Sequence, residues 1–121
     1  MSASHFRRAA LALPGAVEGA HQRTADFSVG KRIFATLGYP DDGWGMVKLT
    51  SEQQSTLVEA EPEIFRPVPG GWGKQGYTNV LLVKADATTL KSALAMAWKN
   101  VAPKSQVKAR EQDGARNKKK P

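Results

Sequence analysis

The sequence predicts an α+β fold, a two-layer sandwich in which helices flank an antiparallel sheet of about five strands. Two short runs of β-forming residues are separated by Gly30-Lys31, a pair typical of a two-residue hairpin turn. Apolar residues over 87–101 recur at helical spacing and form one stripe. Along the chain the order is helix, three or four strands, helix, one or two strands, helix, which indicates an α+β two-layer sandwich.

The first helix is expected over residues 4–13, with Ser4 as its N-cap and Pro14-Gly15 as its stop. Alternating and β-branched residues follow, so the chain changes from helical to extended structure. A turn is expected at 39–43, where the composition is rich in Pro, Asp and Gly. The strands expected in this half are 17–21, 27–29, 33–37 and 44–49.

The hairpin at Gly30-Lys31 suits a type II′ turn, which places glycine first. In the strand that follows, side chains should alternate between the two faces of the sheet. That alternation puts Ile33, Ala35 and Leu37 on one face. Phe34 and Thr36 then lie on the other.

The second helix has two possible starts with capping-box spacing, Thr50 with Gln53 or Ser51 with Gln54. It should end near residue 60, because Pro62 cannot continue a helix interior. The next elements are an edge strand over 64–68, which contains a proline, and a glycine-rich loop over 70–76. A continuously apolar strand over 77–84, covered on both faces, is followed by a third helix, over 87–101 and capped by Asp86.

With 121 residues the chain fits a single domain that can bury a core without metal or disulfide support. We expect this domain to cover residues 1–103. Residues 104–121 hold seven basic and two acidic residues and few apolar ones, so we expect a disordered basic tail. The net charge of +7 therefore lies mostly in the tail, because residues 1–103 hold 11 basic and nine acidic residues.

The absence of cysteine removes thiolate catalysis, disulfides and Cys-based metal sites. No apolar run approaches the roughly 20 residues that span a bilayer, and no signal-peptide core is evident. We therefore expect a cytoplasmic protein without a membrane partner. His5 and His21 lack a neighbouring ligand or orienting carboxylate in any motif, so we expect no metal, no cofactor and no catalytic residue.

Taken together, several short motifs make the sequence resemble the MmcQ/YjbR-like family over about residues 5–104. Each motif is weak alone, but the set is fairly specific. Its members are Leu13-Pro14-Gly15, Glu18, residues 27–37, Val47-Lys48-Leu49, residues 72–80, Ala97-Trp98 and residues 101–104.

The resemblance implies an antiparallel sheet flanked by helices, similar to secretion-chaperone-like folds, with hairpins proposed to act as a double wing on DNA. It implies no catalytic constellation. This chain departs from the family pattern at Ala97-Trp98, where a Ser-Tyr pair is frequent, and we interpret the change as core variation. The basic tail lies outside the shared pattern.

The candidate nucleic-acid contacts are basic residues at turns, strand ends and the tail. A lysine or arginine at a turn tip can reach phosphates and release counterions. The alternative is that exposed turns and strand ends are simply polar and solvated. Arg66 could extend such a positive surface. The candidates are Lys31, Arg32, Lys48, Lys74, Lys118, Lys119 and Lys120.

Trp72 and Tyr77 border the glycine-rich loop that contains Lys74. Such a loop can stack on a base, although large aromatic side chains more often pack on a sheet. The functional expectation is a non-enzymatic monomer that binds DNA weakly through its hairpins and tail. The alternative is a protein- or peptide-binding module, which predicts an exposed apolar patch.

Overall fold

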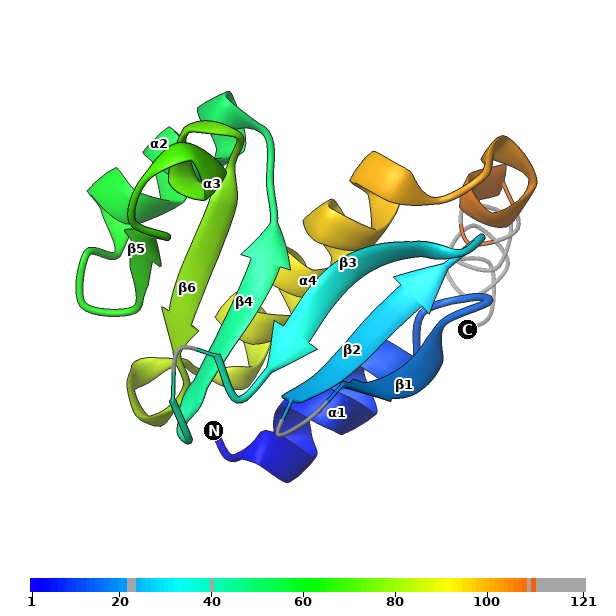
Figure 1. Cartoon of the computed structure of the whole chain (residues 1–121), viewed down its shortest axis with the longest axis horizontal. Helices are drawn as coiled ribbons and strands as arrows, with labels where there is room; N and C mark the ends of the chain where they lie inside the picture. The colour runs from blue at the N-terminus through cyan, green and yellow to red at the C-terminus, as the bar shows by residue number, and fades with distance from the viewer. Residues whose placement is uncertain (22–23, 40, 109, 111–121) are drawn as a thin grey trace, which may run out of the picture.

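The computed structural model describes residues 1–21, 24–39, 41–108 and 110 (Figure 1). One six-stranded sheet is flanked by helices, which confirms the predicted α+β class with one strand more than expected. The elements in chain order are α1 (Ala3–Leu11), β1 (Val17–His21), β2 (Thr24–Val29), β3 (Arg32–Leu37), β4 (Trp44–Lys48), α2 (Ser51–Ala60), β5 (Phe65–Pro67), α3 (Gly71–Lys74), β6 (Tyr77–Leu81), the 3₁₀ turn η1 (Leu82–Lys84) and α4 (Ala87–Val101).

The sheet order is β1-β2-β3-β4-β6-β5, and every neighbouring pair is antiparallel. Helices α1 and α4 lie behind the sheet in Figure 1, and both contact β3. The face toward them carries the core. The opposite face, toward the viewer in Figure 1, is called the open face below.

The apolar stripe of α4 packs onto the inner face of the sheet as its spacing predicts. Leu90, Leu94 and Trp98 are buried, and Phe6 of α1 meets Phe27 of β2 at a ring-centroid distance of 5.9 Å. Asp86 is the N-cap of α4, since its Oδ1 accepts the backbone N–H of Thr89 at 2.7 Å. The predicted bounds of this helix are confirmed.

The N-cap of α1 is Ser2, so the prediction of Ser4 is wrong. Ser2 Oγ accepts the backbone N–H of His5, and Ser2 N–H donates to His5 Nδ1 at 3.1 Å. This reciprocal capping box satisfies two backbone donors at the helix start. The open choice for α2 resolves to Thr50 with Gln53, which form the same kind of box.

The hairpin turn between β2 and β3 is type I′, not type II′. Gly30 and Lys31 both have positive φ, at 57° and 67°, whereas type II′ requires it only at the first position. The predicted alternation after the turn is also wrong at its start. A register shift between Phe27 and Ser28 places a bulge in the pairing, so Phe34 is buried and Ile33 is 46% exposed.

Two further expectations in the second half need correction. The glycine-rich loop contains the single-turn helix α3, and strand β6 ends at Leu81 rather than continuing to Lys84. Leu82 N–H donates to the carbonyl of Gly43, and η1 then turns the chain toward α4. Val83 is consequently 75% exposed, so the apolar run is not covered on both faces. The edge position of β5 is confirmed.

Helical structure continues past the expected domain end at residue 103. Residues 104–108 and Arg110 are helical, and Val107 packs against the core. Pro103 lies against the hairpin turn, where a Cβ on Gly30 would be 2.8 Å from its Cγ. Residues 109 and 111–121, with Lys118, Lys119 and Lys120, lie outside the described residues, and disorder there stays a prediction.

Candidate nucleic-acid interface

The sheet topology places four of the candidate nucleic-acid contacts, those that precede the tail, at one end of the sheet. Because β3 and β4 are antiparallel, Arg32 at the start of β3 and Lys48 at the end of β4 lie at the same end. Lys48 pairs with Tyr77, which begins β6, and Lys74 ends α3 just before that strand. Lys31 lies at the hairpin tip. Lys48 is half-buried, and the other three basic residues are exposed.

These residues form two groups rather than one compact patch. Figure 1 shows the β2–β3 hairpin curving away from the sheet, with its tip on the side opposite α3. Lys31 and Arg32 therefore belong to the hairpin, whereas Lys48 and Lys74 belong to the β4–β6 region. A ligand that contacts both groups must extend along this end of the sheet.

A row of cross-strand partners crosses the open face. From β2 to the edge strand β5, each residue of this row is the register partner of the next. The row is Asp26, Thr36, Met46, Asn79 and Arg66. Neighbouring positions on the same strands, such as Phe27 and Val47, belong to the buried core. Side chains alternate along a strand, so this row points away from α1 and α4.

Aromatic side chains on the open face are paired with cations. The Lys48 Nζ lies 5.6 Å from the centroid of the Tyr77 ring, and the Arg66 guanidinium carbon lies 4.3 Å from that of Trp44. Since Arg66 is on β5 and Trp44 on β4, the arginine side chain crosses β6 to reach the ring. Such pairs contribute about 0.5–1 kcal/mol each at exposed sites and hold the cations on this face.

A hollow of about 240 Å³ lies on the open face. Trp72 and Tyr77 border it from the β6 side, with ring centroids 5.1 Å apart and an interplanar angle of 84°. Tyr39 borders it from the β3 side. Trp72 is 60% exposed and Tyr39 is 40% exposed, which is unusual for aromatic side chains. The lining residues are Thr24, Thr36, Tyr39, Met46, Val68, Trp72 and Tyr77.

Polar groups lie in and beside this hollow. The hydroxyl of the buried Thr36 donates to Asp26 Oδ1 at 3.3 Å, which holds the carboxylate next to Thr36, one of the lining residues. Asn79 is 2% exposed, and its Oδ1 has no hydrogen-bond partner within the described part of the chain. An unpaired buried acceptor costs about 1–3 kcal/mol of stability.

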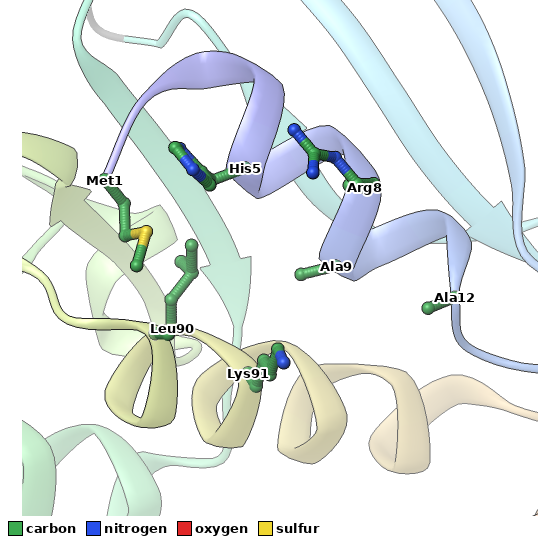
Figure 2. A pocket seen from close by; sticks show the side chains of 8 residues that line it. Met1, His5, Arg8, Ala9, Ala12, Leu90 and Lys91 are labelled. Atoms are coloured by element: carbon green, nitrogen blue, oxygen red, sulfur yellow. The ribbon is translucent and has the colours of Figure 1, made fainter.

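A second hollow, of about 310 Å³, lies between α1 and α4 (Figure 2). Its floor is apolar and includes Met1, Ala9 and Leu90. His5 and Arg8 of α1 and Lys91 of α4 supply its ionisable side chains, and none of the acidic residues that the structure describes lines it. Figure 2 shows these side chains projecting from the two helices around the hollow.

His5 is occupied in the capping box of α1, with its Nδ1 2.7 Å from Ser2 Oγ. The side chain of His21 lies outside the described residues. Glu18 forms an ion pair with Arg7, whose Nε lies 3.0 Å from Oε1. Over the ranges that the structure describes, no group of three or more His, Asp or Glu residues is placed to hold a metal ion.

Sequence reasoning identified Trp72, Tyr77 and Lys74 as one local group but missed Tyr39 and Asp26. Tyr39 precedes Trp72 by 33 positions in the sequence, and only the pairing of β3, β4 and β6 joins them on one face. Asp26 immediately precedes the buried Phe27 in β2. The alternation of side chains between the two faces of a strand is the signal that could have placed Asp26 on the open face.

The fold and the sites define a small α+β protein with an antiparallel sheet, one helix-covered face and one open face. The YjbR family model matches residues 11–100, so the chain belongs to the YjbR family. The crystal structure of Deinococcus radiodurans protein DR2400, a DUF419 domain, superposes with a TM-score of 0.71 at 22% identity and covers 86% of this chain and 80% of that one. This likeness shows the shared fold. No curated protein matches the sequence. In the described segments, no helix is both long and apolar enough to cross a membrane.

Proposed function

We propose that this protein is a non-enzymatic, cytoplasmic DNA-binding protein that contacts phosphates with the basic end of its sheet. The observation that supports the proposal is the shared end of Lys31, Arg32, Lys48 and Lys74. Each cation placed on a phosphate releases condensed counterions, which favours binding irrespective of base sequence. Because these contacts are few, the affinity is modest, and because they are ionic it falls as the salt concentration rises.

The hairpin is suited to the role of a wing. Its type I′ turn projects Lys31 and Arg32 from the end of the sheet, and Pro103 supports the turn at Gly30. The tail residues Lys118–Lys120 add non-specific attraction in this proposal, because a tethered cationic segment raises the local concentration of binding groups. The folded contacts position the duplex, and the tail increases its residence time.

The test is fluorescence anisotropy of the full chain with a labelled DNA duplex over a salt series. The variants are Lys31→Ala with Arg32→Ala, and Lys74→Ala. Lys84→Ala is the matched control, because Lys84 is also exposed but follows the opposite end of β6. The hairpin variants should reduce the slope of log K against log salt by about 0.9 for each lost contact. Equal effects of all variants would contradict the proposal.

A chain that ends after Arg110 separates the folded contacts from the tail, since it keeps the helical residues that pack on the core. The proposal expects weaker binding that still depends on Lys31 and Arg32. Complete loss of duplex binding on truncation would assign the activity to the tail alone.

A second candidate function is the binding of an acidic peptide, and the hollow of Figure 2 favours it. An apolar floor rimmed by Arg8, Lys91 and His5 complements an apolar anchor residue flanked by carboxylates. Ala12→Phe would fill the hollow, and Arg8→Glu would reverse the charge on its rim. Calorimetry with a Glu-flanked Leu peptide should show binding that both changes abolish, while duplex binding is retained.

A further inference from the structure

We infer that the hollow on the open face binds one unpaired nucleobase. The protein then binds single-stranded DNA by stacking a base on Trp72. The inference rests on the proposed function and extends it, because the basic end of the sheet requires only phosphates. The inference assigns a ligand to the open-face hollow, which the proposed phosphate contacts do not occupy.

The first support is the exposure of aromatic rings around one hollow. Trp72 and Tyr39 are the two aromatic residues among the exposed large hydrophobic side chains of the described structure, and both border the same 240 Å³ space. The edge-on contact with Tyr77 orients Trp72 without stacking a parallel ring on it. Exposed aromatic surfaces on a sheet are how single-strand-binding proteins hold bases, because every base has a π-face.

The second support is the polar edge of the hollow. Thr36 and Thr24 line it, and the hydroxyl of Thr36 donates at 3.3 Å to Oδ1 of Asp26, its cross-strand partner just outside the lining. A carboxylate repels phosphate but accepts hydrogen bonds from the amino groups of cytosine, adenine and guanine. Thymine has no amino group. The polar edge therefore favours bases that carry an amino group, and it disfavours a phosphate at the floor of the hollow.

The third support is the position of the cations. Lys48 is held against Tyr77, and Lys74 ends the helix that carries Trp72. Phosphates on either side of a base stacked on Trp72 thus pass basic side chains. The opposite border, beyond Tyr39, leads into the exposed Asp41-Asp42 pair, which is unfavourable for phosphate. We expect the strand to run along the α3 side of the hollow.

The experiment compares labelled dC12, dA12 and dT12 with a duplex of equal length, using the full chain and its variants in anisotropy titrations at one salt concentration. Trp72→Ala should weaken binding of the single strands by about 5- to 100-fold, the range that loss of one base–aromatic stack produces. Duplex affinity should change less than twofold, and Trp72→Phe should restore most of the single-strand affinity. Val83→Ala, an exposed apolar position beyond β6, is the matched control.

Asp26→Asn tests the polar edge, since an amide can also donate to the carbonyls of thymine. The preference for dC12 over dT12 should shrink while overall affinity is retained. Thermal unfolding of each variant verifies that the fold is intact.

The outcomes separate this inference from the proposed function. If duplex binding responds to Lys31 and Arg32 but Trp72→Ala leaves single-strand affinity unchanged, the nucleobase site is wrong and duplex binding stands. If Trp72→Ala lowers single-strand and duplex affinity equally, the site is also wrong. If the full chain binds neither single strands nor duplex, both proposals fall.

Discussion

The indole Nε1 of Trp98 donates a hydrogen bond of 2.8 Å to the carbonyl oxygen of Pro14. The contact joins α4 to the segment that leads from α1 into β1, and Trp98 is 1% exposed. The position is thus part of the core, in agreement with the interpretation of Ala97-Trp98 as a core variation.

Trp98→Phe should lower the free energy of unfolding by about 2–4 kcal/mol. The change leaves the carbonyl of Pro14 without its donor and opens a cavity where the second ring was. Urea denaturation followed by circular dichroism measures the effect. Lys99→Ala, at the exposed neighbouring position, is the control and should change stability by less than about 0.5 kcal/mol.

Lys31→Gly should raise stability by up to about 1 kcal/mol, because Lys31 has the positive φ of 67° that glycine adopts freely. The same variant should weaken duplex binding, since it removes a cation from the tip. Gly30→Ala should act in the opposite direction on stability, as its Cβ would collide with Pro103. A stabilised Lys31→Gly protein with unchanged DNA affinity would argue against a phosphate contact at this residue.

Gly76→Ala should be severely destabilising, by at least about 3 kcal/mol. The residue has φ of 103°, and an added Cβ would overlap the carbonyl oxygen of Leu49. Gly43→Ala provides the comparison, because Gly43 has a similar φ of 86° but open space around the added atom. Its cost should be only the backbone strain of about 1–2 kcal/mol. Equal losses in thermal unfolding would show that the contact with Leu49 is unimportant.

The stability of α4 should depend on pH through Asp86. Hydrogen bonds from the backbone and side chain of Thr89 hold the pKa of the Asp86 carboxyl below its ordinary value of 3.8. A lowered pKa in the folded state stabilises the protein above the ordinary value, and this contribution is lost as the pH falls through the folded-state pKa. Melting temperatures of the parent and Asp86→Asn should therefore differ most near neutral pH and converge in acid. A constant difference across this range would contradict the assignment.

Local signals were sufficient for elements whose structure depends on neighbouring residues. The stripe Leu90, Leu94, Trp98 and the cap at Asp86 predict α4 because helix periodicity and capping act within a few residues. The turn at Gly30-Lys31 was located correctly for the same reason, although its type was wrong. Lys31 has the left-handed conformation of a type I′ turn. The twist of two paired strands suits types I′ and II′ alike, so the pair Gly30-Lys31 alone does not decide between them.

Features that depend on pairing between distant segments could not be predicted. The bulge that buries Phe34 arises from the register of β2 against β3. The open-face hollow needs β3, β4 and β6 side by side before Tyr39 and Trp72 share a border. The sequence shows Trp72 as an aromatic residue among glycines, but its exposure follows from α3, whose single turn places it at the surface.

The contact between Pro103 and Gly30 has a mechanical consequence. Bending of the wing on a bound duplex would displace the start of the C-terminal helical segment, whose Gln106 lies beside Gly15 at the entry to the first strand. The tip of the β2–β3 hairpin is thereby braced by a residue that lies more than 70 positions later in the chain. Shortening the chain ahead of Pro103 should leave that tip free to swing.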